Sequence, residues 1–257
     1  METTSRDGQP IHYDVAGTGP TALVFVHGWL GRLGWWDHTR ANLAPAYTVV
    51  ALDLAGHGAS GQTRVEQSIA AYADDVLAVV RAVAAPRVVL VGHSMAGAVV
   101  LAAAPGVERL DGIILIDTLK DLDAPPPPSV DTMLALYRRD FASAVRTILP
   151  RFLFAPGTPP AVVAMLSEEF LAVDGDRAAA LLAPLYRFDA RAAAADVRVP
   201  VRAIGGDLHP TNAAANRRYL ADYDYVDLAA CGHYPMLEQP DAFVAALRAA
   251  LVATAPR

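Results

Sequence analysis

The sequence of 257 residues contains one cysteine, Cys231, and one lysine, Lys120. A single cysteine excludes an intramolecular disulfide and a zinc site built from several cysteines. The chain also lacks any run of basic residues of the kind that contacts nucleic acid, and its formal net charge is -6. We therefore expect no nucleic-acid partner.

Long apolar runs are missing as well. The first ten residues, METTSRDGQP, contain no apolar signal segment, and no stretch of the chain is long and apolar enough to cross a bilayer. We therefore expect a cytoplasmic protein without a membrane partner, either a monomer or a homodimer.

Several cofactor and metal motifs are also absent. The chain contains neither an H-E-x-x-H pair nor a P-loop lysine. Gly17 and Gly19 precede the first apolar run, whereas the glycines of a dinucleotide-binding loop follow a strand. We expect no metal and no cofactor.

The chain has enough apolar residues to form a hydrophobic core, since 54% of its residues are hydrophobic. Short apolar runs bounded by turn residues predict strands that are buried on both faces, and helical patterns separate them. Such alternation predicts an α/β fold with a mostly parallel central sheet flanked by helices. The predicted strands are 22–26, 47–52, 87–91, 112–116, 199–204 and 223–228, after an N-terminal hairpin that turns at Asp7-Gly8.

One segment breaks this alternation. Residues 119–195 show no convincing strand; they open with the proline run 125–128 and continue with apolar residues at helical spacing. We interpret 119–195 as a helical insertion over the sheet, with 1–118 and 196–257 forming the core domain.

Ser94 is the first candidate for chemistry, in the segment Gly92-His93-Ser94-Met95-Ala96 between a predicted strand and a predicted helix. So tight a turn needs small neighbours and exposes the serine hydroxyl at the carboxyl edge of the sheet. The alternative is a purely structural role, in which Ser94 only caps the helix, because serine is a favoured N-cap residue.

A nucleophilic serine needs a base, and the base needs a third group that orients it. His233 follows the last predicted strand and is the candidate base. Asp207, after the strand VRAIGG, is the favoured acid, with Asp117, after GIILI, as its rival. We do not expect Cys231 to be the nucleophile, because a free cysteine at a strand end is commonly a small buried hydrophobe.

An oxyanion also needs backbone donors. The N–H of Met95 lies at the start of a helix, and the turn His27-Gly28-Trp29 after the first apolar strand is placed to offer the N–H of Trp29. Gly28 would let the backbone approach a substrate closely.

Five segments together resemble the α/β-hydrolase fold superfamily, and the serine esterases and cofactor-free haloperoxidase-like enzymes within it. They are FVHGW at 25–29, LDLAGHGAS at 52–60, VGHSMAG at 91–97, GGD at 205–207 and GHYPMLEQP at 232–240. The resemblance implies a triad of Ser94, Asp207 and His233, with the N–H groups of Trp29 and Met95 as oxyanion hole. Ala96 departs from the pattern, since the family usually has glycine there.

The resemblance also implies that 119–195 is a cap domain that shapes the pocket. Residues expected to line it are Gly28, Trp35, Trp36, Met133, Tyr137, Phe152 and Phe154. The predicted function is cleavage of small to medium carboxylic esters through an acyl-enzyme. The alternatives are perhydrolase or haloperoxidase-like activity, carbon–carbon bond hydrolysis, and a small-molecule receptor that retains the triad.

Overall fold

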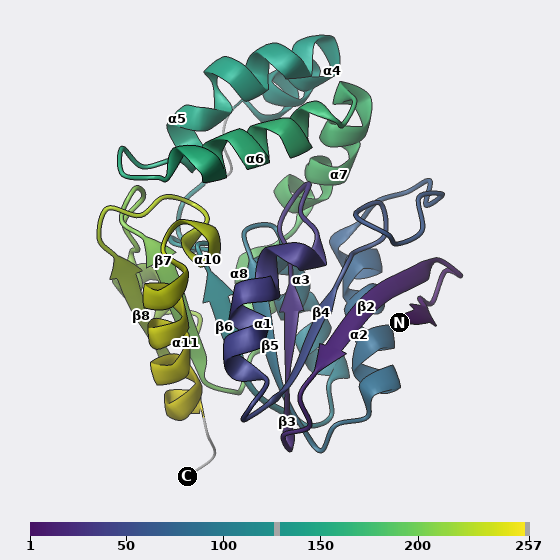
Figure 1. The fold of residues 1–257 in the computed structure, drawn as a ribbon, viewed down its shortest axis with the longest axis vertical. Coiled ribbons are helices and arrows are strands. Elements are labelled where there is room, and N and C mark those ends of the chain that lie inside the picture. The colour runs from purple at the N-terminus through teal and green to yellow at the C-terminus, as the bar shows by residue number, and fades with distance from the viewer. Residues whose placement is uncertain (126–128, 255–257) are drawn as a thin grey trace.

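A computed structural model describes residues 1–125 and 129–254. Eight strands form one sheet in the order β1-β2-β4-β3-β5-β6-β7-β8 (Figure 1). The strands from β3 to β8 are mutually parallel, whereas β1 and β2 pair antiparallel with each other and β2 pairs antiparallel with β4. Their bounds are β1 Glu2–Thr4, β2 Pro10–Ala16, β3 Thr21–Val26, β4 Thr48–Leu52, β5 Arg87–His93, β6 Leu110–Ile116, β7 Val201–Gly206 and β8 Tyr223–Leu228.

The central strands are continuous apolar runs because helices cover both of their faces. In β3, β4 and β5 every residue after the first is buried. By contrast β8 lies at the edge of the sheet and leaves Tyr225 and Val226 about two-fifths exposed. The predicted α/β class and the N-terminal hairpin are confirmed.

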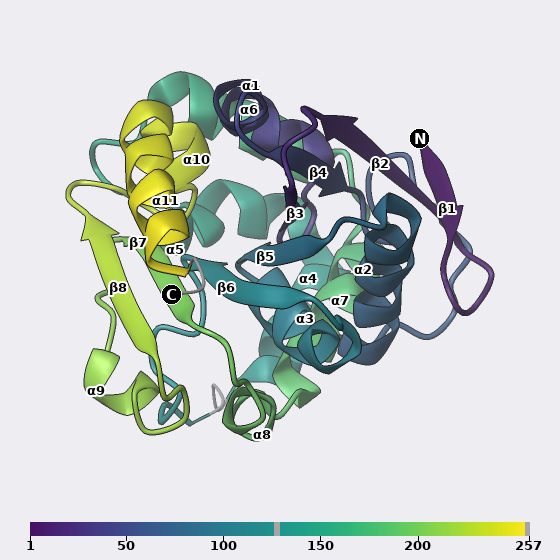
Figure 2. The same ribbon diagram turned by 90° about the horizontal axis from the view of Figure 1, so that it is seen from below.

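Helices lie on both sides of the sheet (Figure 2). The helices α1 and α11 cover one face, while α2, α3 and α8 cover the other. The helices are α1 Asp37–Leu43, α2 Ile69–Val83, α3 Ala96–Ala103, α4 Val130–Thr147, α5 Leu149–Leu153, α6 Pro160–Leu171, α7 Gly175–Arg187, α8 Ala190–Ala195, α9 Ala213–Asn216, α10 Pro235–Glu238 and α11 Pro240–Thr254. Short 3₁₀ turns occupy Leu33–Trp36 and Ala104–Gly106.

A layer of helices, α4 to α7, lies above the carboxyl ends of the parallel strands (Figure 1). In the described part of the chain between β6 and β7, every regular element is a helix. The apolar stripe of α4 packs inward, with Tyr137, Phe141 and Val145 buried, although the helix is interrupted at Asp140. Of the predicted proline spacer, residues 126–128 lie outside the described residues.

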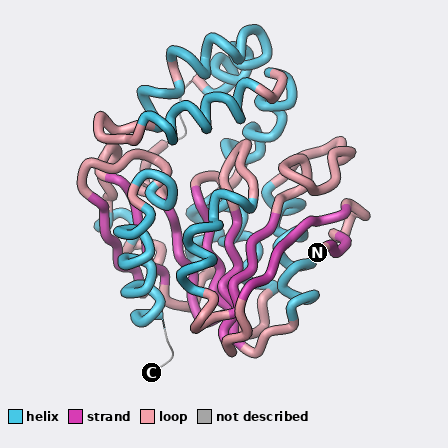
Figure 3. The backbone as a smooth tube through the Cα atoms, viewed as in Figure 1, coloured by secondary structure: helices cyan, strands magenta, loops and turns pink. Residues whose placement is uncertain are grey.

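The loops that follow the parallel strands meet beneath this helical layer (Figure 3). In parallel sheets this carboxyl edge is where binding and catalytic groups gather. The candidate residues lie in these loops.

Candidate active site

Ser94 occupies the turn between β5 and α3, with a left-handed backbone at φ +54°. The turn leaves no space for larger neighbours. A Cβ on Gly92 would lie 2.4 Å from the carbonyl oxygen of Ala96, and one on Gly97 would lie 2.4 Å from Cγ2 of Thr118. A non-glycine residue in this conformation is uncommon and costs strain, which surrounding contacts must hold in place. Ala96 itself is fully buried and fits at the first position of the helix.

His233 reaches this serine from the loop between β8 and α10. Its Nε2 lies 2.8 Å from Oγ of Ser94, and its Nδ1 lies 2.6 Å from Oδ2 of Asp117. With the proton on Nδ1, the imidazole donates to Asp117 and accepts from the serine hydroxyl. The three side chains therefore form one continuous chain of hydrogen bonds.

The prediction that Asp207 orients His233 is wrong. The Asp207 carboxylate is exposed and accepts the backbone N–H groups of Ala230 and Cys231, at 3.0 and 3.1 Å. These bonds brace the loop that leads into His233 but keep the carboxylate away from the imidazole. The rival, Asp117 at the end of β6, occupies the position next to His233.

Asp117 is buried, and two further groups hold its other oxygen. The backbone N–H of Gly206 donates to Oδ1 at 2.9 Å, and Nζ of Lys120 lies 2.8 Å from the same atom. Burial alone raises the pKa of the Asp117 carboxyl. The hydrogen bond and charge of His233, followed by the charge and hydrogen bond of Lys120, outweigh burial and hold that pKa well below its usual range.

Two backbone N–H groups are free for an oxyanion. In the described part of the chain, the N–H groups of Trp29 and Met95 donate to no other group. Gly28 brings the Trp29 turn against the nucleophile, since a Cβ at Gly28 would lie 2.8 Å from Cβ of Ser94. The two amides thus flank the serine, and that of Met95 gains from the helix N-terminus behind it.

The loop that carries His233 is tied to the helical layer by two hydrogen bonds. The backbone N–H of His233 donates to the carbonyl of Leu153 at 2.8 Å. The buried carboxylate of Glu238 accepts the N–H groups of Gly232 and Tyr234 and the hydroxyl of Thr158, which follows α5. The segment from Leu153 to Thr158 therefore helps to fix the position of His233.

A cavity of about 600 Å³ opens over the serine. Helices α4, α5 and α7 form most of its wall, and among the described residues no arginine, lysine, aspartate or glutamate lines it. The lining residues are Trp29, His93, Ser94, Ser129, Thr132, Met133, Leu136, Tyr137, Ile148, Leu149, Phe152, Leu153, Leu182, Leu185, Tyr186, His233 and Tyr234. Such a wall suits an uncharged, apolar ligand.

Of the expected pocket residues, Met133, Tyr137 and Phe152 line this cavity. The expectation for Trp35 and Trp36 is wrong, because both are buried in the core beneath it, where the ring of Trp36 lies 5.0 Å from that of Phe25. The indole N–H of Trp35 donates to Glu169.

Gly28 and Phe154 also lie outside the lining. Gly28 is covered by Ser94 and His93, and the ring of Phe154 packs 6.2 Å from that of Tyr234. The sequence pattern missed Tyr186, Leu182 and Leu185, because their place in the wall depends on how α7 packs against α4.

His93 is a buried neighbour of His233. Its Nε2–H donates to the backbone carbonyl of His233 at 2.8 Å, and the two rings lie 4.8 Å apart. Burial, and then the nearby charge of His233, lower the pKa of His93 to about 3. His93 is therefore neutral at physiological pH and supports the loop without exchanging protons there.

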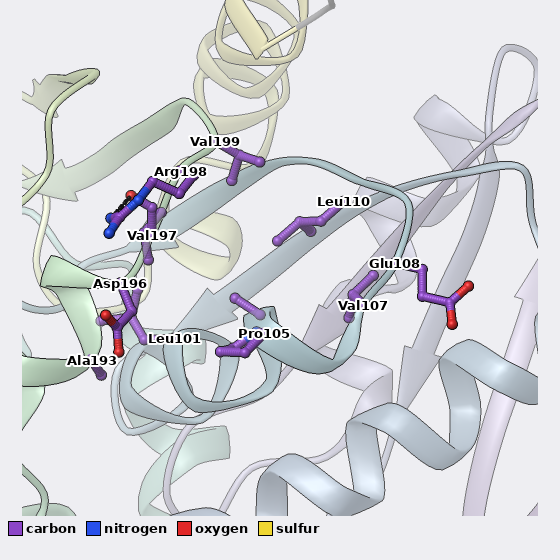
Figure 4. Close-up of a pocket in the computed structure, with 11 residues that line it drawn as sticks. Leu101, Pro105, Val107, Glu108, Leu110, Ala193, Asp196, Val197, Arg198 and Val199 are labelled. Carbon is purple, nitrogen blue, oxygen red and sulfur yellow. Dashed lines mark hydrogen bonds between the residues drawn. The ribbon is translucent and has the colours of Figure 1, made fainter.

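A second cavity, of about 290 Å³, lies between the 3₁₀ turn Ala104–Gly106, β6 and the segment after α8 (Figure 4). Its one arginine, Arg198, donates to the carbonyls of Ala195 and Val197. This cavity contains none of the three hydrogen-bonded residues. The described residues include no group of three or more histidine, cysteine or acidic side chains arranged to hold a metal ion.

No helix within the described ranges has the length and apolar character needed to cross a membrane.

Comparison with known proteins matches a model of the "Alpha/beta hydrolase family" to residues 23–246. A pimeloyl-[acyl-carrier protein] methyl ester esterase of Nitrosospira multiformis is 28% identical over 254 residues, covering 91% of this chain and 95% of that protein. A solved esterase of Thermogutta terrifontis superposes with a TM-score of 0.85 at 24% identity, covering 99% of this chain and 98% of the other.

An uncharacterized protein of Mycobacterium bovis is 37% identical over 105 residues, which is 40% of this chain. The matched region spans only 30% of the length of that mycobacterial relative.

Proposed function

Because the chain belongs to the alpha/beta hydrolase family, we propose that it is a serine hydrolase that cleaves small to medium carboxylic esters. One observation carries the proposal: the hydrogen-bonded chain from Ser94 through His233 to Asp117, at the floor of an apolar cavity. A helix-capping serine would need neither the histidine nor the buried carboxylate.

In the proposed reaction His233 accepts the proton of Ser94 as Oγ attacks the ester carbonyl carbon. The carbonyl oxygen becomes an oxyanion between the N–H groups of Trp29 and Met95. The protonated His233 then gives its proton to the leaving alcohol, and the acyl group stays on Ser94. Water, deprotonated by His233, releases the acid and restores the serine hydroxyl.

Asp117 has two roles in this scheme. Its hydrogen bond to Nδ1 keeps the lone pair of His233 on Nε2, facing the serine. Its charge stabilises the imidazolium that forms during attack. The low pKa of Asp117 keeps the carboxylate ionised throughout the pH range in which such a reaction runs.

The segment from 119 to 195, which contains the helical layer α4 to α7, is proposed to act as the cap that selects the acyl group. Met133, Tyr137 and Leu182 present apolar surface to the cavity. The absence of cationic residues from its lining argues against acidic substrates, and so against the carbon–carbon hydrolase alternative, whose substrates are usually acidic. The Nitrosospira relative is named for methyl ester cleavage, which agrees with the proposed reaction class.

The proposal is tested with p-nitrophenyl esters of increasing chain length and the variant Ser94→Ala. Loss of the nucleophile should reduce kcat by a factor on the order of 10⁶, and a serine-reactive phosphonate should label Ser94 alone. Ser68→Ala is the matched control, because Ser68 caps α2 and lies outside the cavity. Ester hydrolysis that persists in Ser94→Ala would refute the proposal, and a single burst without turnover would favour a receptor.

A further inference from the structure

We propose that Lys120 is a positioning residue for the reaction, a built-in cation that fixes Asp117 and thereby influences how activity depends on pH. The inference rests on the proposed function. Lys120 is the only lysine in the chain and lies three residues after Asp117.

The ammonium of Lys120 is surrounded by oxygen acceptors. Its Nζ lies 2.8 Å from Oδ1 of Asp117 and donates to the carbonyls of Gly206 and His209, each at 2.5 Å. The side chain is only 14% exposed. Salt screens partly buried pairs far less than surface pairs, so this charge acts on Asp117 at close to full strength.

The backbone is shaped to place this cation. Asp117 and Leu119 both adopt left-handed conformations, at φ +44° and +48°, which non-glycine residues rarely do. This tight turn brings Lys120 back over Asp117. Strain of this kind persists only where surrounding contacts over-determine the conformation, and it clusters at functional sites.

Gly205 provides the space that the ammonium occupies. A Cβ at this position would lie 2.6 Å from Nζ of Lys120 and 3.0 Å from Oδ1 of Asp117. Any larger residue would push the cation away from the carboxylate. Gly205, the first glycine of the GGD segment, thus makes room for the ammonium of Lys120. Asp207, the aspartate of that segment, does not reach the imidazole of His233.

The two oxygens of Asp117 therefore face opposite partners: Oδ2 receives His233, and Oδ1 receives Lys120 and the Gly206 N–H. Lys120 therefore partly neutralises the carboxylate whose charge, in the proposed reaction, stabilises the imidazolium of His233. The other titratable groups around this cluster are Asp227, whose Oδ1 lies 3.7 Å from Nζ, and Asp207, Cys231, His93, Tyr234 and Glu238.

The test is the pH dependence of kcat/KM for a p-nitrophenyl ester in Lys120→Met. Removing the cation leaves the full charge of Asp117 beside the imidazole. The acid limb of the profile, where activity falls as the pH is lowered, should therefore move to higher pH by on the order of one unit. At pH values below the limb, the variant should lose about tenfold more activity than at the plateau. Arg217→Met, which removes an exposed cation paired with Asp224, is the matched control and should leave the limb in place.

Gly205→Ala gives a second, independent perturbation, because it displaces the ammonium while keeping the lysine. It should shift the limb in the same direction. An acid limb that stays in place or moves to lower pH in folded Lys120→Met would overturn the proposal.

A measurement on the unaltered protein does not depend on turnover. With ¹³C-labelled lysine, the sole lysine gives a single side-chain ε-carbon NMR signal. Its shift should inflect at the same pH as the acid limb of kcat/KM, and an ε-carbon shift with no inflection at that pH would overturn the proposal. Persistent hydrolysis by Ser94→Ala would instead refute the esterase function and leave this titration interpretable.

Discussion

Replacing Asp117 with asparagine should abolish most of the activity while leaving the fold intact. The new side chain has the same shape, but one of its oxygens becomes an NH₂ group. Lys120 and the Gly206 N–H both donate to the Oδ1 position, so the amide oxygen must remain there. The NH₂ group is then forced to face Nδ1 of His233.

An NH₂ group at that place can only donate, so Nδ1 must accept and the ring proton moves to Nε2. His233 then presents an N–H to Ser94 and cannot remove its proton. The same substitution in serine proteases lowers kcat by about 10⁴, which corresponds to about 5.5 kcal/mol of transition-state stabilisation. We expect a loss of similar size here.

The assay is kcat/KM for a p-nitrophenyl ester at pH 8, with circular dichroism and thermal melting as checks on the fold. Asp207→Asn is the matched control, since it makes the identical chemical change in the carboxylate that the sequence favoured. It should cost less than about tenfold, because it weakens only one of two loop hydrogen bonds. The reasoning is refuted if Asp207→Asn loses most of its kcat/KM while Asp117→Asn retains a kcat/KM within tenfold of that of the parent.

Three further outcomes are expected. Ala96→Val should lower ester hydrolysis at least tenfold, because two added methyl groups have no room beside the serine turn, where Ala96 is fully buried; a fully active variant would contradict this account. His93, neutral when folded with its pKa lowered to about 3, takes up a proton when the chain unfolds below about pH 6.5. As the pH is lowered from about 6 to about 4, the free energy of unfolding should therefore fall faster in the parent than in His93→Asn, by about 1.4 kcal/mol per pH unit. Urea denaturation at several pH values measures this difference, and an equal dependence of stability on pH in the two proteins would contradict it. Leu136→Trp should fill part of the 600 Å³ cavity and shift the preferred acyl chain to shorter lengths, measured as kcat/KM across the ester series; an unchanged preference would mean that the acyl chain lies elsewhere.

Much of this fold follows from local pattern. Strands buried on both faces must be continuous apolar runs, and segments such as 22–26 and 112–116 are too short and too apolar to be anything but core strands in an alternating chain. Ser94 and His233 were predictable because a tight strand-to-helix turn and a loop after the last strand each leave local signatures.

The acid could not be chosen in the same way. Asp117 and Asp207 both follow parallel strands and both lie between Ser94 and His233 in sequence, so order and loop position do not separate them. The choice depends on where each short loop turns: Asp207 meets backbone amides of its neighbouring loop, whereas the left-handed turn at Asp117 faces the histidine. The chain's only lysine lies three residues after Asp117, but the sequence alone does not show that its ammonium reaches this carboxylate.

Trp35 and Trp36 show that the residues lining the pocket could not be chosen from the sequence either. Aromatic residues near an active-site loop are equally suited to lining a cavity or filling a core, and tertiary packing decides between them. Here the indole N–H of Trp35 finds Glu169 of α6, and Trp36 packs on Phe25 of β3.

The bonds from the helical layer to the catalytic loop limit how this protein can be re-engineered. Leu153 and Thr158 hold the loop of His233, one through its carbonyl and the other through Glu238. If the proposed esterase function holds, a cap transplanted from a relative would carry a new acyl preference, but it would also remove the support of His233, the proposed general base. Successful chimaeras should therefore keep 153–158 with the recipient and exchange only the helices on either side.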